Sequence, residues 1–179
     1  MNEKIRKALN EQINAELYSS YLYLSMASYF KRLAFDGAAR WMEVQAIEEL
    51  THAMKFFNFI NERGGKVDLT AIEGPPTSWD SPLSAFEAVY SHEVKVSARI
   101  YDLVNIAAEQ KDHATVNFLQ WFITEQVEEE TSADGIVQKL KLIGGEGGGM
   151  YLLDRELAQR VFTPPPGTTI LGAGGKGSA

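Results

Sequence analysis

The stretch EELTHA, residues 48–53, places ionisable side chains in the middle of an otherwise apolar helical stripe. Inward positions recur at steps of three or four residues from Met42 to Phe59, which is the spacing of one face of an α-helix. Glu49 and His52 fall on that face. Carboxylate and imidazole groups are both common metal ligands, so we expect a buried helix that carries two of them at i and i+3.

This arrangement occurs twice in the chain. Adding 77 to positions 16, 49 and 52 gives positions 93, 126 and 129, and each of the six is a ligand-type residue on an inward face. The first set is Glu16, Glu49 and His52, and the second set is Glu93, Gln126 and Glu129. The repeat predicts two helical hairpins, each with a carboxylate on its first helix and a pair of ligands on its second.

Four long periodic segments and the breakers between them define the expected fold. We expect helices over 3–33, 38–64, 82–111 and 113–143, with stop and start signals at Gly64-Gly65, Asp80-Ser81-Pro82 and Asp112. Alternating strand patterns are absent. The connection 65–81 is long enough to cross the length of a helix, so the second and third helices can run parallel and the polar groups can meet at one height.

The C-terminal part has a different composition. We expect a flexible glycine-rich hinge at 144–149, a short fifth helix at 150–162 and a disordered tail rich in proline and glycine at 163–179. The sequence thus predicts an all-α protein: one domain, 1–162, that forms a four-helix bundle with a long crossover between helices 2 and 3.

Composition excludes several classes of protein. The 179 residues include no cysteine, which rules out disulfide scaffolds, thiolate zinc sites and iron–sulfur clusters. A net charge of -7 without a block of Lys or Arg argues against a nucleic-acid partner. No uncharged apolar run is long enough to span a bilayer, and the N-terminus does not resemble a signal peptide, so we expect a cytoplasmic protein with no membrane partner.

Four carboxylates meeting in an apolar interior require positive charge. Lys and Arg are missing from the four inward faces around the polar layer. Burying even one unpaired charge costs several kcal/mol, but two divalent cations would balance the four carboxylates of Glu16, Glu49, Glu93 and Glu129. Neutral His52 and Gln126 would complete the ligand shell. Oxygen-rich ligation with a single imidazole favours iron or manganese.

The sequence resembles the non-haem ferritins of bacteria and archaea over residues 1 to about 162. The resemblance is carried by NAELYSSYLYL at 14–24, EELTHA at 48–53 and EQVEEE at 125–130. Bacterioferritins carry a second Glu-x-x-His motif and a haem-ligating Met, where this chain has Gln126-x-x-Glu129 and Leu50. Rubrerythrins need cysteine ligands. The resemblance therefore implies a ferritin-like bundle without haem.

The resemblance also implies roles for individual residues. Glu16, Glu49 and His52 would hold the first iron of a di-iron ferroxidase centre. Glu93 and Glu129 would hold the second iron, with Glu49 bridging and Gln126 beside it. Tyr23 would donate a hydrogen bond to this centre; the alternative is ordinary core packing. A third iron site would comprise Glu48, Glu125 and Glu128 with Glu129 shared; the alternative is a solvated acidic surface.

The implied function is iron storage and detoxification. Fe(II) would be oxidised to Fe(III) by dioxygen or hydrogen peroxide and deposited as mineral inside a homo-oligomeric shell of 24 subunits. Leu17, Tyr21, Leu22 and Leu24 lie off the inward face, and we expect a neighbouring subunit to cover them. Two alternatives remain open: a di-iron oxygenase or peroxidase acting on an organic substrate, and a structural bundle that binds no redox metal.

Overall fold

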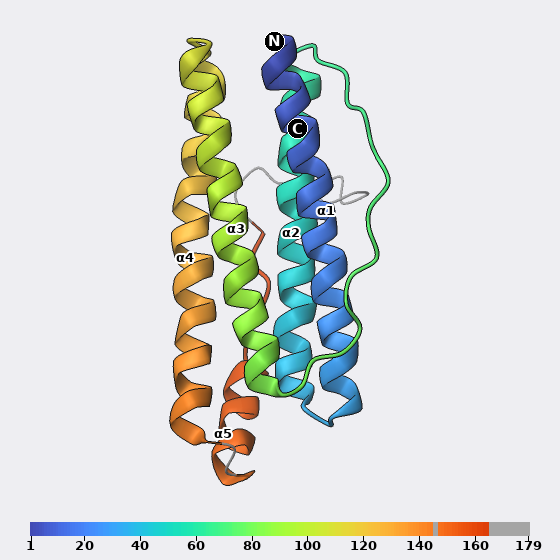
Figure 1. Cartoon of the computed structure of the whole chain (residues 1–179), viewed down its shortest axis with the longest axis vertical. Coiled ribbons are helices and arrows are strands. Elements are labelled where there is room, and N and C mark those ends of the chain that lie inside the picture. The colour runs from blue at the N-terminus through green and yellow to red at the C-terminus, as the bar shows by residue number, and fades with distance from the viewer. Residues whose placement is uncertain (145–146, 165–179) are drawn as a thin grey trace, which may run out of the picture.

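The computed structural model describes residues 1–144 and 147–164, which fold into a bundle of four long helices with a short fifth helix at one end (Figure 1). The helices are α1 (Glu3–Arg32), α2 (Asp36–Glu62), α3 (Pro82–Glu109), α4 (His113–Ile143) and α5 (Gly147–Leu157). The described residues contain no strand. The predicted all-α fold class, with a long crossover and a short fifth helix, is confirmed.

Figure 1 shows that α2 and α3 run in the same direction, because the segment between them returns along the whole length of α1. Side chains of α1 hold this crossover by hydrogen bonds to its backbone. Nδ2 of Asn14 donates to the carbonyl of Ala71 at 2.9 Å, and Oγ of Ser25 donates to the carbonyl of Pro76 at 2.6 Å. The parallel course of α2 and α3 brings both halves of the repeat to one height.

The helix ends follow the predicted signals. Ser81 caps α3 in a capping box with Ser84, and Pro82 occupies the first turn. The side chain of Asp112 caps α4 by accepting from the backbone N–H of Thr115 at 3.1 Å. Gly64 adopts φ +66° just after α2, a conformation that glycine takes at little cost.

The buried apolar side chains form two clusters along the bundle. One cluster packs residues such as Tyr23, Phe30 and Phe86, and the other packs residues such as Phe56 and Phe122. On each long helix the ligand-type residues lie in sequence between the two clusters. The polar layer is therefore closed off on both sides by tightly packed apolar residues.

Helix α5 differs from the expectation in its position and in its docking. It begins at Gly147 and ends at Leu157, so residues 147–149, which were expected in a flexible hinge, form its first turn. Asp154 docks α5 against the start of α2, because its Oδ1 accepts from the backbone N–H of Ala38 at 2.9 Å. A Cβ atom at Gly37 would lie 1.7 Å from the carbonyl oxygen of Asp154, so this contact requires glycine. Residues 145–146 of the expected hinge and 165–179 of the expected tail lie outside the described residues.

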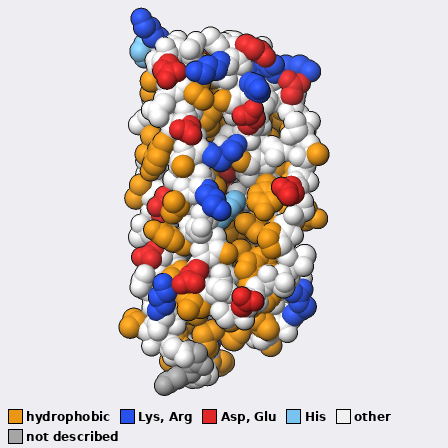
Figure 2. Space-filling model, in the orientation of Figure 1, with side chains coloured by type: hydrophobic (Ala, Val, Ile, Leu, Met, Phe, Trp, Pro, Cys, Tyr) orange, Lys and Arg blue, Asp and Glu red, His pale blue; other side chains and the backbone are white. Residues whose placement is uncertain are grey.

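Apolar side chains gather on the face that Figure 2 presents. Tyr21 and Leu24 of α1 are exposed at 51% and 52%, as expected for residues that another subunit would cover. The expectation was wrong for Leu22, which is buried in the core. Among the described residues, no helix has both the length and the apolar character needed to cross a membrane.

Candidate metal centre

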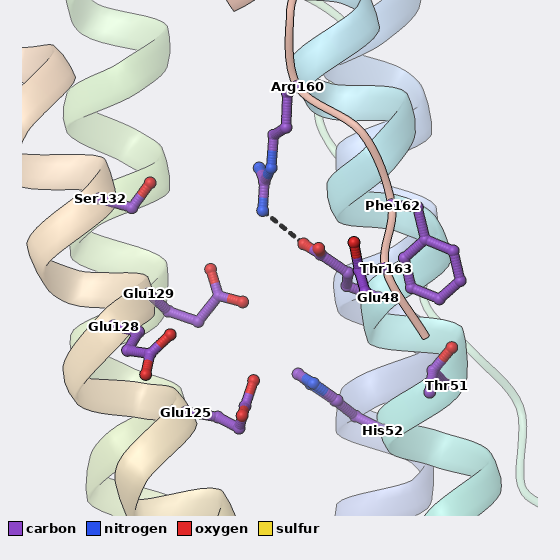
Figure 3. Close-up of a pocket in the computed structure, with 10 residues that line it drawn as sticks. All are labelled: Glu48, Thr51, His52, Glu125, Glu128, Glu129, Ser132, Arg160, Phe162 and Thr163. Carbon is purple, nitrogen blue, oxygen red and sulfur yellow. Dashed lines mark hydrogen bonds and ion pairs between the residues drawn. The ribbon is translucent and has the colours of Figure 1, made fainter. Parts of the chain in front are cut away.

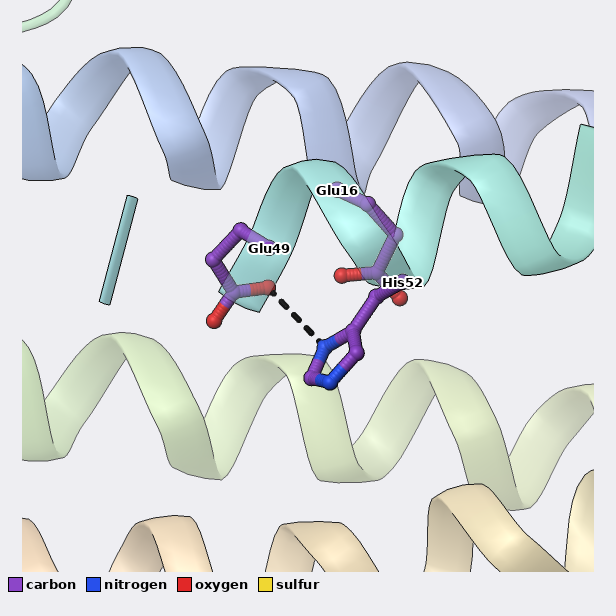
Figure 4. A group of neighbouring side chains, drawn as sticks. All are labelled: Glu16, Glu49 and His52. Carbon is purple, nitrogen blue, oxygen red and sulfur yellow. Dashed lines mark ion pairs between the residues drawn. The ribbon is translucent and has the colours of Figure 1, made fainter. Parts of the chain in front are cut away.

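The α1–α2 hairpin brings together Glu16, Glu49 and His52 (Figure 4). One ligand atom from each residue lies within 4.8 Å of the other two, and all three side chains are buried. Oε2 of Glu16 and Oε2 of Glu49 have no hydrogen-bond partner among the described residues, and Nδ1 of His52 lies 3.4 Å from the latter oxygen. Buried carboxylate oxygens without partners are rare because desolvation is costly. Their position next to an imidazole is that of ligands for a cation.

The α3–α4 hairpin adds the other half of the predicted set to the same layer. Glu93, Gln126 and Glu129 are all buried. The carboxylate of Glu93 accepts from the hydroxyl of Tyr23 and from Nε2 of Gln126, the latter at 3.2 Å. Nε2 of Gln45 donates to Oε2 of Glu129 at 2.7 Å and approaches Oε1 of Glu49 at 3.3 Å. These bonds connect the two hairpins through the centre.

Gln12 and Arg99 support the site, although the sequence interpretation had not included them. Nε2 of Gln12 donates to Oε1 of Glu16 at 2.8 Å, and Oε1 of Gln12 accepts from Nε of Arg99 at 3.1 Å. Because a guanidinium can only donate, Arg99 fixes which end of the amide faces Glu16. A signal was present, since both Glu16 and Glu49 have a glutamine four residues earlier, at positions 12 and 45.

The electrostatics of the metal-free site favour protonated carboxyl groups. Burial, followed by the charge of Glu49, raises the pKa of Glu16 to about 8. Burial and the charge of Glu129 raise the pKa of Glu93 to about 8 as well. Burial, with the charges of Glu93 and Glu129, also raises the pKa of Glu49 well above its ordinary value. Cations bound between these groups would replace the protons and restore the charged forms.

Histidine 92 does not join the centre, although it is adjacent to Glu93 in the sequence. Its Nε2 lies 2.8 Å from Oγ of Ser19, and its ring packs edge-on against Tyr23. Burial lowers the pKa of His92 to about 4, so the ring is neutral at physiological pH. This residue is a satisfied histidine of the protein interior.

A second group of acidic residues lines a cavity of about 220 Å³ between α2 and α4 (Figure 3). Its walls include all residues of the expected third iron site, and it also reaches the centre through His52. The acidic lining residues are Glu48, Glu125, Glu128 and Glu129. Burial raises the pKa of Glu48 to about 7, against the opposing effect of Arg160.

Arg160 was not expected in this cavity. It follows α5, and its guanidinium forms an ion pair with Glu48 (Figure 3). The guanidinium also lies 4.3 Å from the centre of the Trp41 ring. No sequence pattern links positions 48 and 160, because their contact depends on how α5 docks.

Comparisons with known proteins agree with this fold. The family model described as Ferritin-like domain matches residues 6–143. A bacterial non-heme ferritin from Bacteroides fragilis is 48% identical over 160 residues, which cover 89% of this chain and 99% of that protein. A Campylobacter jejuni bacterial non-heme ferritin is 42% identical, with coverage of 87% and 93%.

Solved structures give the same result. An engineered closed form of the Archaeoglobus fulgidus ferritin is 59% identical, with a TM-score of 0.90 and coverage of 91% of this chain and 99% of the other. The open pore ferritin from that archaeon is 58% identical, with a TM-score of 0.89 and coverage of 90% and 99%. This chain belongs to the ferritin family, in its prokaryotic non-haem branch.

Proposed function

We propose that the chain is a ferroxidase that stores iron: it binds Fe(II) in the buried layer, oxidises it and passes Fe(III) to a mineral held inside a multi-subunit shell. The observation that carries this proposal is the pair of buried oxygens on Glu16 and Glu49 beside His52, for which residues 1–144 and 147–164 supply no hydrogen-bond partner. Membership of the ferritin family supports the same conclusion.

The donor set assigns two iron positions. Glu16, Glu49 and His52 would bind the first Fe(II), for which their geometry is already assembled. Glu93 and Glu129 would bind the second after releasing hydrogen bonds from Tyr23 and Gln45. The family resemblance implies that Glu49 would bridge the two. Gln126 would remain beside the second iron.

The chemistry of the site favours oxidation. Each Fe(II) gives up one electron, and two such electrons reduce dioxygen to hydrogen peroxide or hydrogen peroxide to water. Anionic oxygen ligands stabilise the higher charge of Fe(III) more than that of Fe(II), because the attraction grows with the charge of the ion. Before iron binds, Tyr23 holds Glu93 in place through its hydroxyl group.

Storage requires that the product leave the centre and that a container receive it. The acidic cavity between α2 and α4 shares His52 and Glu129 with the centre, so it provides the next position for the departing iron. A third iron would bind there between Glu48, Glu125, Glu128 and Glu129. We expect a shell of 24 subunits, in which neighbours cover exposed apolar residues such as Tyr21 and Leu24.

Iron loading tests this function. The metal-free protein is mixed with Fe(II) without oxygen, air is admitted, and oxidation is followed by absorbance while retained iron is measured after gel filtration. Many ferric ions retained per chain in a large particle would support storage. Oxidation that stops at the capacity of the centre without retention would favour an oxygenase, and no binding would favour a structural bundle.

A further inference from the structure

Arg160 occupies a position that a metal ion in the acidic cavity would need. Its NH2 group pairs with Oε2 of Glu48, one of the carboxylates that line the cavity (Figure 3). Both side chains are largely shielded from water, with 20% and 22% exposed. The other terminal nitrogen, NH1, is buried and has no hydrogen-bond partner among the described residues. The guanidinium is thus held in the cavity wall, and not all of its donors have hydrogen-bond partners among the described residues.

The contact is built into the fold through α5. Asp154 binds the start of α2, and Leu153 and Leu157 are buried in the core, so the residues after α5 begin from a fixed point. Phe162 and Thr163 then line the same cavity as Arg160. Residues 160–163 therefore cross the cavity as a wall supplied by the C-terminal segment.

We propose that Arg160 is an internal counter-ion that competes with metal ions for Glu48, so that a metal can fill the cavity only when Arg160 leaves. The inference rests on the proposed function, because it concerns the position that iron would reach after the centre. A carboxylate that is paired with a guanidinium cannot offer the same oxygen to a metal, and the two cations repel each other.

This competition would weaken metal binding in the cavity and leave metal binding in the buried centre unchanged. The apparent affinity of a site is its intrinsic affinity multiplied by the fraction of time for which the site is available. An ion pair formed about 90% of the time therefore weakens metal binding about tenfold. Among the described residues, Arg160 contacts Glu48 and Trp41 and forms no hydrogen bond or ion pair with Glu16, Glu49 or His52. Weak binding in the cavity would favour the onward movement of iron instead of its retention.

Zinc provides a redox-inert probe of this proposal. Zn(II) is titrated into the assembled metal-free protein by calorimetry, and the binding constants of the centre and the cavity are resolved. We expect Arg160→Gln to strengthen zinc binding in the cavity about tenfold and to leave the centre unchanged. Arg155→Gln is the matched control, because Arg155 is an exposed arginine of α5 that lies near Tyr151. It should change neither constant.

Two further measurements make the test specific. In a Glu48→Gln background, Arg160→Gln should have a smaller effect than in the wild type, since the competing pair is already gone and only the repulsion between the guanidinium and the metal is removed. In the wild-type protein, zinc in the cavity should increase hydrogen exchange of residues 158–163, a readout that needs no variant of Arg160. Cavity binding that Arg160→Gln leaves unchanged or weakens, or exchange that zinc does not alter, would overturn the proposal. Failure of the proposed function would give a different result. In that case the His52→Ala variant would bind zinc as tightly as the wild type does.

Discussion

The two hairpins of the bundle carry equivalent positions but prepare them differently. In the α1–α2 hairpin, Glu16 and Glu49 each keep one buried oxygen without a hydrogen-bond partner in the part of the chain that the structure describes. In the α3–α4 hairpin, the carboxylates of Glu93 and Glu129 receive hydrogen bonds from Tyr23, Gln126 and Gln45. The first half is open to a cation, whereas the second half is satisfied by protein donors in the metal-free state.

The two halves differ at two positions of the repeat. Glu49 corresponds to Gln126 and His52 corresponds to Glu129, so each half carries two carboxylates and one neutral side chain. The neutral side chain of the α1–α2 half is an imidazole that can ligate a cation, whereas that of the α3–α4 half is an amide whose Nε2 donates to Glu93. We infer that the first iron binds in the α1–α2 half and that its positive charge then favours binding in the other half.

Glu49 links the two halves, so its removal should have the largest effect. Glu49→Ala should slow the initial oxidation of Fe(II) more than about 100-fold, because even residues that only orient ligands are worth about 10- to 100-fold. Stopped-flow absorbance after mixing with aerated buffer measures the rate. Gel filtration should show an intact particle, and an initial rate equal to that of the wild type would refute the bridging role.

The two halves can be compared by replacing the one neutral side chain in each, His52 and Gln126. His52→Ala should weaken the tightest Zn(II) site about 100-fold, whereas Gln126→Ala should weaken it less than about tenfold. Calorimetric titration of the metal-free proteins gives both values. Equal losses in the two variants would show that the halves bind metal alike, contrary to the asymmetry of their hydrogen bonds.

The pH dependence of stability tests the protonated carboxyl groups of the open half. Because the pKa of Glu16 is raised to about 8 in the folded protein, its contribution is complete below its unfolded pKa and is lost as pH rises towards 8. Between pH 6 and pH 9 the metal-free wild type should therefore lose about 2 kcal/mol more unfolding free energy than Glu16→Gln does. Urea unfolding at both pH values measures this.

The control for this experiment is Glu128→Gln, which removes an exposed carboxylate outside the buried layer. Its stability should follow that of the wild type over the same pH interval. If Glu16→Gln also follows the wild type, then Glu16 is not held as the protonated acid and the layer contains a cation or water that compensates its charge.

The smallest expected effect comes from the support of Glu16. Gln12→Leu removes the amide that directs Oε2 of Glu16 towards the site, and it should weaken the tightest Zn(II) site about tenfold. Gln120→Leu, at an exposed glutamine of α4, is the matched control and should have no effect. Unchanged affinity in Gln12→Leu would mean that packing alone orients Glu16.

Much of the fold and the site could be predicted because the relevant signals are local. The helix ends at Ser81 and Asp112 follow from capping chemistry, which involves only neighbouring residues. The burial of Glu93 and Gln126 follows from helical periodicity. Leu22 shows the limit of this reasoning, because its burial depends on which neighbouring elements cover that side of α1.

The contacts that could not be predicted join distant parts of the chain. Gly37 is required by the close approach of Asp154, which lies more than a hundred residues further along the chain. Likewise, Arg99 reaches the centre only through Gln12. Such contacts produce no periodic pattern in the sequence, since each depends on a single pair of residues whose separation in sequence carries no information.

The sequence by itself determined that two matched sets of ligands would face one another inside a helical bundle, because helical periodicity and the offset of 77 residues place positions 16, 49 and 52 opposite 93, 126 and 129. Only the tertiary structure decided which ligand oxygens stay free and which cation reaches the acidic cavity. Hydrogen-bond donors and the guanidinium of Arg160 take their places through packing between helices, and packing is a property of the folded chain as a whole.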